Sequence, residues 1–248
     1  MEDQMPDPLV AYFTTGEGNA LRSVSATVLT GLLELPPASA RLVADWQREI
    51  LRLGLEAGDV EPLSLARART RWPDYRLCVQ AMDDWMGSIG LPGMLADAEL
   101  ALMACLGARY HHDAEQYGSA AFCNLFLSED RGQDLHFPAT GQRIPLQRGR
   151  VVIFDTAQPH AVIRRDKAGF DADDFSVVAD CSQVFLSWEL PIEQPRLASA
   201  LGIAFDIDPA SGPRLDREPV WLDGTPAKLC PETGRWSPSE PQDQKSSE

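Results

Sequence analysis

Residues 149–165 read "GRVVIFDTAQPHAVIRR", and this stretch sets the expectation for the whole fold. Residues 151–155 form a run of β-branched and aromatic side chains, which is typical of a buried strand. A short turn containing a proline follows, and His160 then opens a second apolar run. The stretch therefore predicts two consecutive strands whose connecting turn brings a histidine to the edge of a sheet.

Similar short runs lie on both sides of this stretch, between residues 98 and 192. They are "ELALMACLGARY", "SAAFCNLFLSE", "DLHFP", "RIPLQ", "GRVVIFD", "HAVIRR" and "SQVFLSWEL". Gly, Pro, Asp and Asn separate them. Seven or more short strands at this spacing predict a sandwich or a small barrel rather than βαβ units.

The flanking segments have a different character. Residues 1–97 are expected to be a mainly helical support region, with one helix in "PPASARLVADWQREILRLG" (36–54) and another in "DYRLCVQAMDDWMGSIG" (74–90). Ser39 is the expected N-cap of the first helix and Gly54 its stop. Residues 193–236 are expected to pack on the core as an extension with a tight Asp223-Gly224 turn. The polar tail, residues 237–248, should be disordered, which leaves one structural domain overall.

Two of the four histidines lie in "ARYHHDAEQYG" (108–118), next to an aspartate. If this segment is a strand, His111 and Asp113 point to the same face, because residues i and i+2 do so. His160, at the start of a later strand, is the candidate for a third ligand. Two histidines and one carboxylate on one face of a metal leave the opposite face open, as in non-haem Fe(II) oxygenases. His112 should point the other way and be structural or on the surface, and His136 is interpreted as a core histidine or one that supports the ligands, rather than as a ligand.

Composition narrows the function classes. The chain has 37 acidic and 22 basic side chains, a net charge of −15, which disfavours nucleic acid as a partner. Five cysteines without a CxxC pair fit a reducing cytoplasm. The segment "MEDQMPDPLV" lacks the features of a signal peptide, and no apolar run reaches the ~18 residues of a membrane span. We therefore expect a cytoplasmic protein with no membrane partner.

The ordered motifs of residues 98–192 resemble the Fe(II)- and 2-oxoglutarate-dependent dioxygenases, specifically the prolyl-hydroxylase-like branch. The matching pieces are His111-His112-Asp113, "CNLFLSED" (123–130), "GQDLHF" (132–137), "PLQRGRVVIFD" (145–155), His160-Ala161-Val162 and "VFLSWEL" (184–190). The resemblance implies an α+β protein with a mainly β core. That core would be a double-stranded β-helix (jelly-roll or cupin-like) with flanking N-terminal helices that brace the larger sheet.

The resemblance also implies a chemistry. His111, Asp113 and His160 would hold Fe(II), and O₂ and 2-oxoglutarate would take the open positions. Conversion of 2-oxoglutarate to succinate and CO₂ would accompany hydroxylation of a small-molecule or peptidyl substrate. Halogenating relatives have a small residue where this chain has Asp113, so the carboxylate argues against halogenation.

One feature departs from the family pattern. The family holds the distal carboxylate of 2-oxoglutarate with an arginine or lysine that opens the last core strand, where this chain has Ser182 or Gln183. The carboxylate still needs a cation, preferably a guanidinium. Alternation from His160 makes Arg164 the first candidate, ahead of Arg165 and then Arg109. The alternative is that these arginines are solvated charges at a strand end.

Other interpretations remain open at this stage. Asn124 should alternate inward and either hydrogen-bond the co-substrate or be a satisfied buried amide. The acidic residues of loop 166–180 would suit a cationic substrate at the mouth of the site, or simply solvate a flexible loop. The chain is alternatively a cupin-like metal-dependent dioxygenase or isomerase that does not use 2-oxoglutarate, or a non-catalytic barrel.

Overall fold

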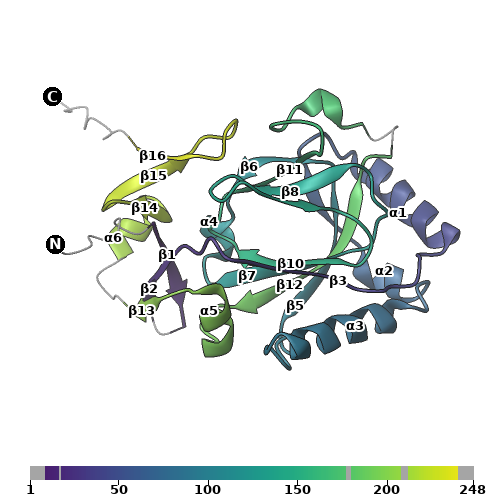
Figure 1. Cartoon of the computed structure of the whole chain (residues 1–248), viewed down its shortest axis with the longest axis horizontal. Helices are drawn as coiled ribbons and strands as arrows, with labels where there is room; N and C mark the ends of the chain where they lie inside the picture. The colour runs from purple at the N-terminus through teal and green to yellow at the C-terminus, as the bar shows by residue number, and fades with distance from the viewer. Residues whose placement is uncertain (1–8, 17, 177–179, 208–211, 240–248) are drawn as a thin grey trace.

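The computed structural model describes residues 9–16, 18–176, 180–207 and 212–239, and it is mainly β with a few helices (Figure 1). A sandwich of two sheets lies at its centre. Helices α1, α2 and α3 flank the sandwich on one side, and a third sheet stands at the opposite end of the long axis (Figure 1). The coarse expectation of a β core with flanking helices is confirmed.

The sandwich consists of a six-stranded sheet and a four-stranded sheet, both antiparallel. The larger sheet contains, in spatial order, β3 (Val28–Leu32), β10 (Arg150–Asp155), β7 (Ala120–Phe126), β12 (Gln183–Pro191), β5 (Glu99–Cys105) and β4 (Val60–Leu63). The smaller sheet contains β6 (Ala108–His111), β11 (His160–Arg164), β8 (Gln133–Phe137) and β9 (Gln142–Pro145). The chain crosses between the sheets repeatedly, which is compatible with a jelly roll.

The strands expected between residues 98 and 192 are all present. The first expected run, "ELALMACLGARY", divides into β5 and β6 at Gly107, whose φ of 71° allows the sharp reversal. Alternation along the strands then separates two cores. On β7, Phe122 and Phe126 face the space between the sheets, while Cys123 and Leu125 face the helices.

The helices cover the outer face of the larger sheet. Helix α1 (Ala40–Leu53) begins where the Ser39 hydroxyl accepts a hydrogen bond from the Leu42 amide, and it ends at Gly54 with φ 69°. Helices α2 (Leu65–Arg69) and α3 (Tyr75–Ser88) follow. Their buried residues, with those of α1, join the outward residues of β5, β7, β10 and β12 in one hydrophobic core.

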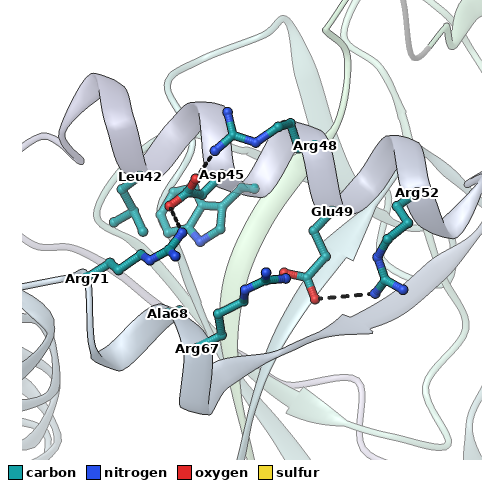
Figure 2. A pocket seen from close by; sticks show the side chains of 9 residues that line it. Leu42, Asp45, Arg48, Glu49, Arg52, Arg67, Ala68 and Arg71 are labelled. Atoms are coloured by element: carbon teal, nitrogen blue, oxygen red, sulfur yellow. Dashed lines mark hydrogen bonds and ion pairs between the residues drawn. The ribbon is translucent and has the colours of Figure 1, made fainter.

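Charged side chains link α1 to the α2 region (Figure 2). Asp45 pairs with Arg48 on its own helix and with Arg71 beyond α2, at 2.9 Å. The Glu49 carboxylate accepts a hydrogen bond from the Ser64 amide at the start of α2. A cavity of about 250 Å³ lies between these groups, and its acids and several of its arginines pair with one another. We interpret it as a packing defect between helices.

The third sheet corrects two expectations at the chain ends. It has the order β13-β2-β1-β14-β15-β16, and its strands are β1 (Val10–Thr15), β2 (Gly18–Ser23), β13 (Phe205–Ile207), β14 (Val220–Leu222), β15 (Thr225–Leu229) and β16 (Trp236–Pro238). The expectation that residues 1–97 are mainly helical was wrong for β1 and β2 in this sheet, and for β3 and β4, which form the two edges of the larger sheet of the sandwich.

The expected disordered tail was wrong at its start, because Ser237 and Pro238 belong to β16 and Ser239 donates its amide to Pro226. Residues 240–248 lie outside the described part of the chain. The expected turn at Asp223-Gly224 is present, with φ 51° and 73°, between β14 and β15. The short helices α5 (Pro195–Leu201) and α6 (Gly212–Leu215) complete the C-terminal segment.

A buried ion pair joins the third sheet to the sandwich. Arg22 on β2 and Asp155 at the end of β10 are both fully buried, and Nη1 lies 2.6 Å from Oδ2. The same Oδ2 accepts the Ser25 amide, and Oδ1 accepts the Ala157 amide. The Arg22 Nε donates to the Gly118 carbonyl. The two buried charges thus pair with each other, and both also form hydrogen bonds with backbone groups, as buried charges require.

We predict that Arg22→Met lowers the free energy of unfolding by about 3–5 kcal/mol, because it leaves the Asp155 carboxylate buried without its counter-charge. Urea denaturation followed by circular dichroism measures this loss. Arg52→Met is the matched control: its side chain is 68% exposed and 4.0 Å from Glu49. It should cost less than about 1 kcal/mol. Equal urea midpoints for the two variants would contradict the structural importance of the Arg22–Asp155 pair.

Candidate metal centre

His111, Asp113 and His160 converge at one end of the sandwich. His111 is the last residue of β6 and His160 the first of β11, and the two are partners in the antiparallel register. Their ring centroids are 4.3 Å apart. One ligand atom of each of the three residues lies within 4.8 Å of the others. The structure therefore brings together the three residues that the sequence analysis selected.

Both imidazoles present the same nitrogen to the centre of this group. The Nδ1 of His111 lies 2.7 Å from the Arg109 carbonyl, and the Nδ1 of His160 lies 3.0 Å from the Gln158 carbonyl. A carbonyl can only accept, so each Nδ1 carries the proton and each Nε2 offers a lone pair. The Nε2 atoms lie 3.8 Å and 3.5 Å from the two carboxylate oxygens of Asp113.

The electrostatics of the group favour a cation. Burial lowers the pKa of His160 well below its usual range, so this ring is a neutral ligand. Burial raises the pKa of the Asp113 carboxyl, and its Oδ2 is buried without a hydrogen-bond partner. A divalent cation would satisfy that oxygen and favour the ionised form of the carboxyl. Two nitrogens and one carboxylate oxygen suit Fe(II).

The local structure at Asp113 differs from the expected one. Strand β6 ends at His111, so Asp113 is not in a strand and the i, i+2 argument does not apply to it. Instead, the Asp113 amide donates to the Thr156 carbonyl at 2.7 Å, and helix α4 (Ala114–Tyr117) begins immediately after it. This hydrogen bond ties Asp113 to the turn between β10 and β11. His160 follows that turn, so the carboxylate lies beside it.

The other two histidines lie outside the centre. The His112 ring packs on Trp236, with centroids 4.8 Å apart, and burial lowers the pKa of His112 to about 4. The Nδ1 of His136 lies 2.6 Å from the Tyr110 hydroxyl on the outer side of the small sheet. As expected, neither ring joins the three candidate ligands; His136, however, is half-buried on the outer face of the small sheet and not in the core.

A cavity of about 270 Å³ extends from the metal ligands into the sandwich. Apolar and aromatic side chains dominate its wall: Val60, Ala101, Met103, Cys105, Ala108, Phe122, Phe126, Leu135, Phe154, Val162 and Phe185. Its polar wall residues, besides the metal ligands, are Gln116, Tyr117, Asn124, Ser187 and Glu189. Among the residues that the structure describes, no arginine or lysine lines this cavity.

The residues expected to bind 2-oxoglutarate take different positions. Asn124 lines the cavity, and its Oδ1 is buried without a partner. Arg164 does not line it; its Nη1 donates to the Arg131 carbonyl at 2.9 Å. Arg165 forms ion pairs with the exposed Asp130 and the buried Asp134, and it does not line the cavity.

The third candidate cation, Arg109, is also outside the cavity. Its guanidinium lies over the ring of Phe170, 5.7 Å from the centroid. Gln183, which with Ser182 was the alternative for the expected cation position, is fully buried, and neither amide atom has a partner among the described residues. The described part of loop 166–180 contributes no residue to the cavity wall. Its Phe175 packs at Gly107, which lies at the β5–β6 turn, the end away from the metal ligands.

The sequence analysis missed the polar residues at the metal end of the cavity. Phe185, Ser187 and Glu189 alternate on the inner face of β12, and the run "SQVFLSWEL" already carries this period of two. Burial, and then the nearby Glu99, raise the pKa of Glu189. Burial, and then Glu189 and Asp113, raise the pKa of the Tyr117 hydroxyl. These shifts place Glu189 in the electrostatic environment of the metal ligands.

No family model matches this sequence, and no curated protein matches it. Similar solved structures include a viral collagen prolyl hydroxylase from Paramecium bursaria Chlorella virus-1. A truncated form has a TM-score of 0.37 at 8% identity, over 66% of this chain and 88% of that chain. Its 2-oxoglutarate complex has a TM-score of 0.38 at 7% identity, over 66% and 94%.

A further similar structure is SnoN, a non-haem α-ketoglutarate-dependent epimerase from nogalamycin biosynthesis. Its TM-score is 0.34 at 14% identity, over 83% of this chain and 88% of that chain. Function is therefore argued from the site itself. In the described part of the chain, every helix is too short or too polar to cross a bilayer.

We predict that His111→Ala, Asp113→Ala and His160→Ala each weaken Fe(II) binding by more than about 100-fold, since loss of a direct ligand should exceed the 10–100-fold effect of outer partners. Anaerobic Fe(II) titration measures the affinity. His112→Ala is the control, because its ring packs on Trp236, away from the centre, and its affinity should change little. If His112→Ala lost iron and His111→Ala kept it, His112 and not His111 would be the ligand.

Proposed function

We propose that this protein is a non-haem Fe(II)- and 2-oxoglutarate-dependent oxygenase that hydroxylates a small molecule or a peptidyl side chain, releasing succinate and CO₂. One observation carries the proposal: two Nε2 lone pairs and an unpartnered Asp113 oxygen meet at the end of an apolar cavity. A metal held there would have protein ligands on one side and the cavity on the other. Bound Fe(II) would supply the oxygen chemistry that no protein side chain performs.

The strand order supports assigning the sandwich to the double-stranded β-helix class. Four strands of the larger sheet, in the order β5-β12-β7-β10, face four of the smaller sheet in the order β6-β11-β8-β9. Successive strands from β5 to β12 thereby wind through both sheets. In this arrangement β6 and β11 are neighbours, and this adjacency sets His111 opposite His160.

The chain's own residues would do three things in this reaction. The Arg109 and Gln158 carbonyls hold the two imidazoles with Nε2 directed at the metal. The Phe154 ring packs on His160 with centroids 4.7 Å apart, which limits the motion of that ligand. The apolar wall restricts water around the reacting groups, and this protects a reactive intermediate from side reactions.

The distal carboxylate of 2-oxoglutarate needs a cationic hydrogen-bond donor, and none of the described residues that line the cavity is an arginine or lysine. We propose that Arg164 serves this carboxylate. It follows Val162, which lines the cavity, by two residues on β11, so the two share a face of the strand. A guanidinium has five N–H donors; Nη1 of Arg164 donates to the Arg131 carbonyl, and Nε lies 3.9 Å from Oδ1 of the exposed Asp166, which leaves Nη2 for a ligand. Its register partner Gln133 has a buried, unpartnered Oε1.

The composition of the cavity wall favours a second candidate function. Among the described residues, the cavity has no lining cation, and burying an unpaired carboxylate would cost several kcal/mol. A metal-dependent dioxygenase or isomerase that acts on a neutral or cationic substrate without 2-oxoglutarate would not need a cation in the cavity wall. The metal centre is the same in both candidates, so the co-substrate alone separates them.

We predict that the Fe(II) protein, titrated anaerobically with 2-oxoglutarate, develops a visible charge-transfer band and that it releases succinate in air. Arg164→Ala should raise the apparent KM for 2-oxoglutarate roughly 100-fold if two charge-assisted hydrogen bonds of ~1.5 kcal/mol each are lost. Arg165→Ala is the control, because Arg165 pairs with Asp130 and Asp134 and does not line the cavity.

The outcomes separate the candidates. Iron binding with neither a band nor succinate would favour the enzyme that does not use 2-oxoglutarate. Succinate release with the same KM in Arg164→Ala and the wild type would remove Arg164 from the site. The buried amides of Asn124 and Gln183 would then be the next groups to replace.

A further inference from the structure

The polar wall of the cavity accepts hydrogen bonds at two places that have no donor in the described structure. Glu189 and Asn124 both line the cavity. Asn124 is 7% exposed, and its Oδ1 has no hydrogen-bond partner. No ion pair or hydrogen bond is recorded for the Glu189 carboxylate within the described ranges. The buried Asn124 oxygen stays unsatisfied unless a ligand brings an N–H or O–H group, and the half-buried Glu189 carboxylate is free to pair with a ligand that enters the cavity.

The two acceptors share one wall. On β12, Glu189 and Ser187 are two residues apart on the inner face, and Ser187 is the register partner of Asn124 on β7. Asn124 is therefore on the strand next to Glu189 and diagonal to it, two residues along the same face. A single ligand of modest size can reach both groups.

This wall also lies near the metal ligands. Glu189 is opposite Phe122, and Phe122 is opposite Phe154, so the three residues form one row across β12, β7 and β10. Adjacent strands are ~4.8 Å apart, which puts the Glu189 backbone about 10 Å from that of Phe154. The Phe154 ring packs on His160. A ligand spanning this row would place one end at Glu189 and the other near the metal.

The charge at this end of the cavity is negative. Glu99 on β5 is the direct register partner of Glu189 and belongs to the same strand face as Ala101 and Met103, which line the cavity. Glu99 is exposed and does not line the cavity, but like charges directly opposite destabilise a sheet, so a cation bound beside Glu189 would relieve this repulsion. Because the cavity wall, as described, contains no arginine or lysine, the protein itself does not provide that cation at the wall.

We propose that this cavity binds a substrate bearing a protonated amine, with Glu189 as the counter-ion and Asn124 Oδ1 as a second acceptor, so that a carbon near the metal is presented for oxidation. This inference rests on the proposed function, because it identifies the cavity as the substrate site. The aromatic side chains of Phe122, Phe126 and Phe154 would contact the apolar part of such a molecule. Glu189 is then a specificity-determining residue rather than a catalytic one.

The test compares two probes of equal shape: phenethylamine, which is cationic at neutral pH, and phenethyl alcohol, which is neutral. Each is titrated calorimetrically into the full chain with excess Mn(II), which permits binding without turnover. The wild type should bind phenethylamine about 10-fold or more tightly than the alcohol, as expected for about 1.4 kcal/mol of charge recognition. Glu189→Gln, a nearly isosteric change, should remove this preference and leave alcohol binding almost unchanged.

Glu193→Gln is the matched control, since Glu193 is exposed, follows β12 and does not line the cavity. It removes the same charge and should keep the amine preference. Thermal unfolding of each variant verifies that it is folded. Equal affinity of the wild type for both probes, no detectable binding of phenethylamine at millimolar concentration, or a preference retained in Glu189→Gln would overturn the proposal.

This readout is independent of the proposed reaction. Amine preference without succinate release would leave the binding inference standing and count against the 2-oxoglutarate reaction. Succinate release without amine preference would support the 2-oxoglutarate reaction and overturn the binding inference.

Discussion

The buried ion pair between Arg22 and Asp155 is the constraint on which the candidate site depends. Asp155 ends β10 and receives the Ala157 amide, so it fixes the first half of the turn that leads to His160. The next residue, Thr156, accepts the Asp113 amide through its carbonyl, and its hydroxyl donates to backbone carbonyls beside α4. One buried network therefore orients two of the three metal ligands. It also explains why a sheet built from the chain ends packs against the metal end of the sandwich.

The cavity combines features that a single ligand would not satisfy. At the metal end, Glu189 and the nearby Glu99 make the environment acidic, while farther in the wall is apolar. The buried polar groups nearby, on Asn124 and Gln183, are neutral amides. The proposed cationic substrate matches the acidic end, whereas the described wall has no cation for an anionic co-substrate. The proposed 2-oxoglutarate reaction therefore needs a cation from outside the wall, for which Arg164 is the first candidate.

The sequence predicted the regular elements well because their signals are local. The Ser39 cap, the Gly54 stop and the Asp223-Gly224 turn each depend on residues within a few positions, and all three are present. Strand alternation likewise placed Asn124 in the cavity wall. The same reasoning missed the strands of residues 10–32. Their partners, apart from each other, lie more than a hundred residues away in β10, β13 and β14.

The sequence by itself selected His111, Asp113 and His160 as candidate metal ligands, because the His111–Asp113 pair and the turn before His160 are short local patterns, and the structure brings the three side chains together. It did not determine how Asp113 is held: the expected strand ends at His111, and a hydrogen bond to Thr156 replaces it. Only the tertiary structure decided that Arg22 neutralises Asp155, and that Arg164 stands outside the cavity while Glu189 stands inside it. These facts depend on which strands become neighbours. Strand adjacency is set by packing of the whole chain, and no local pattern encodes it.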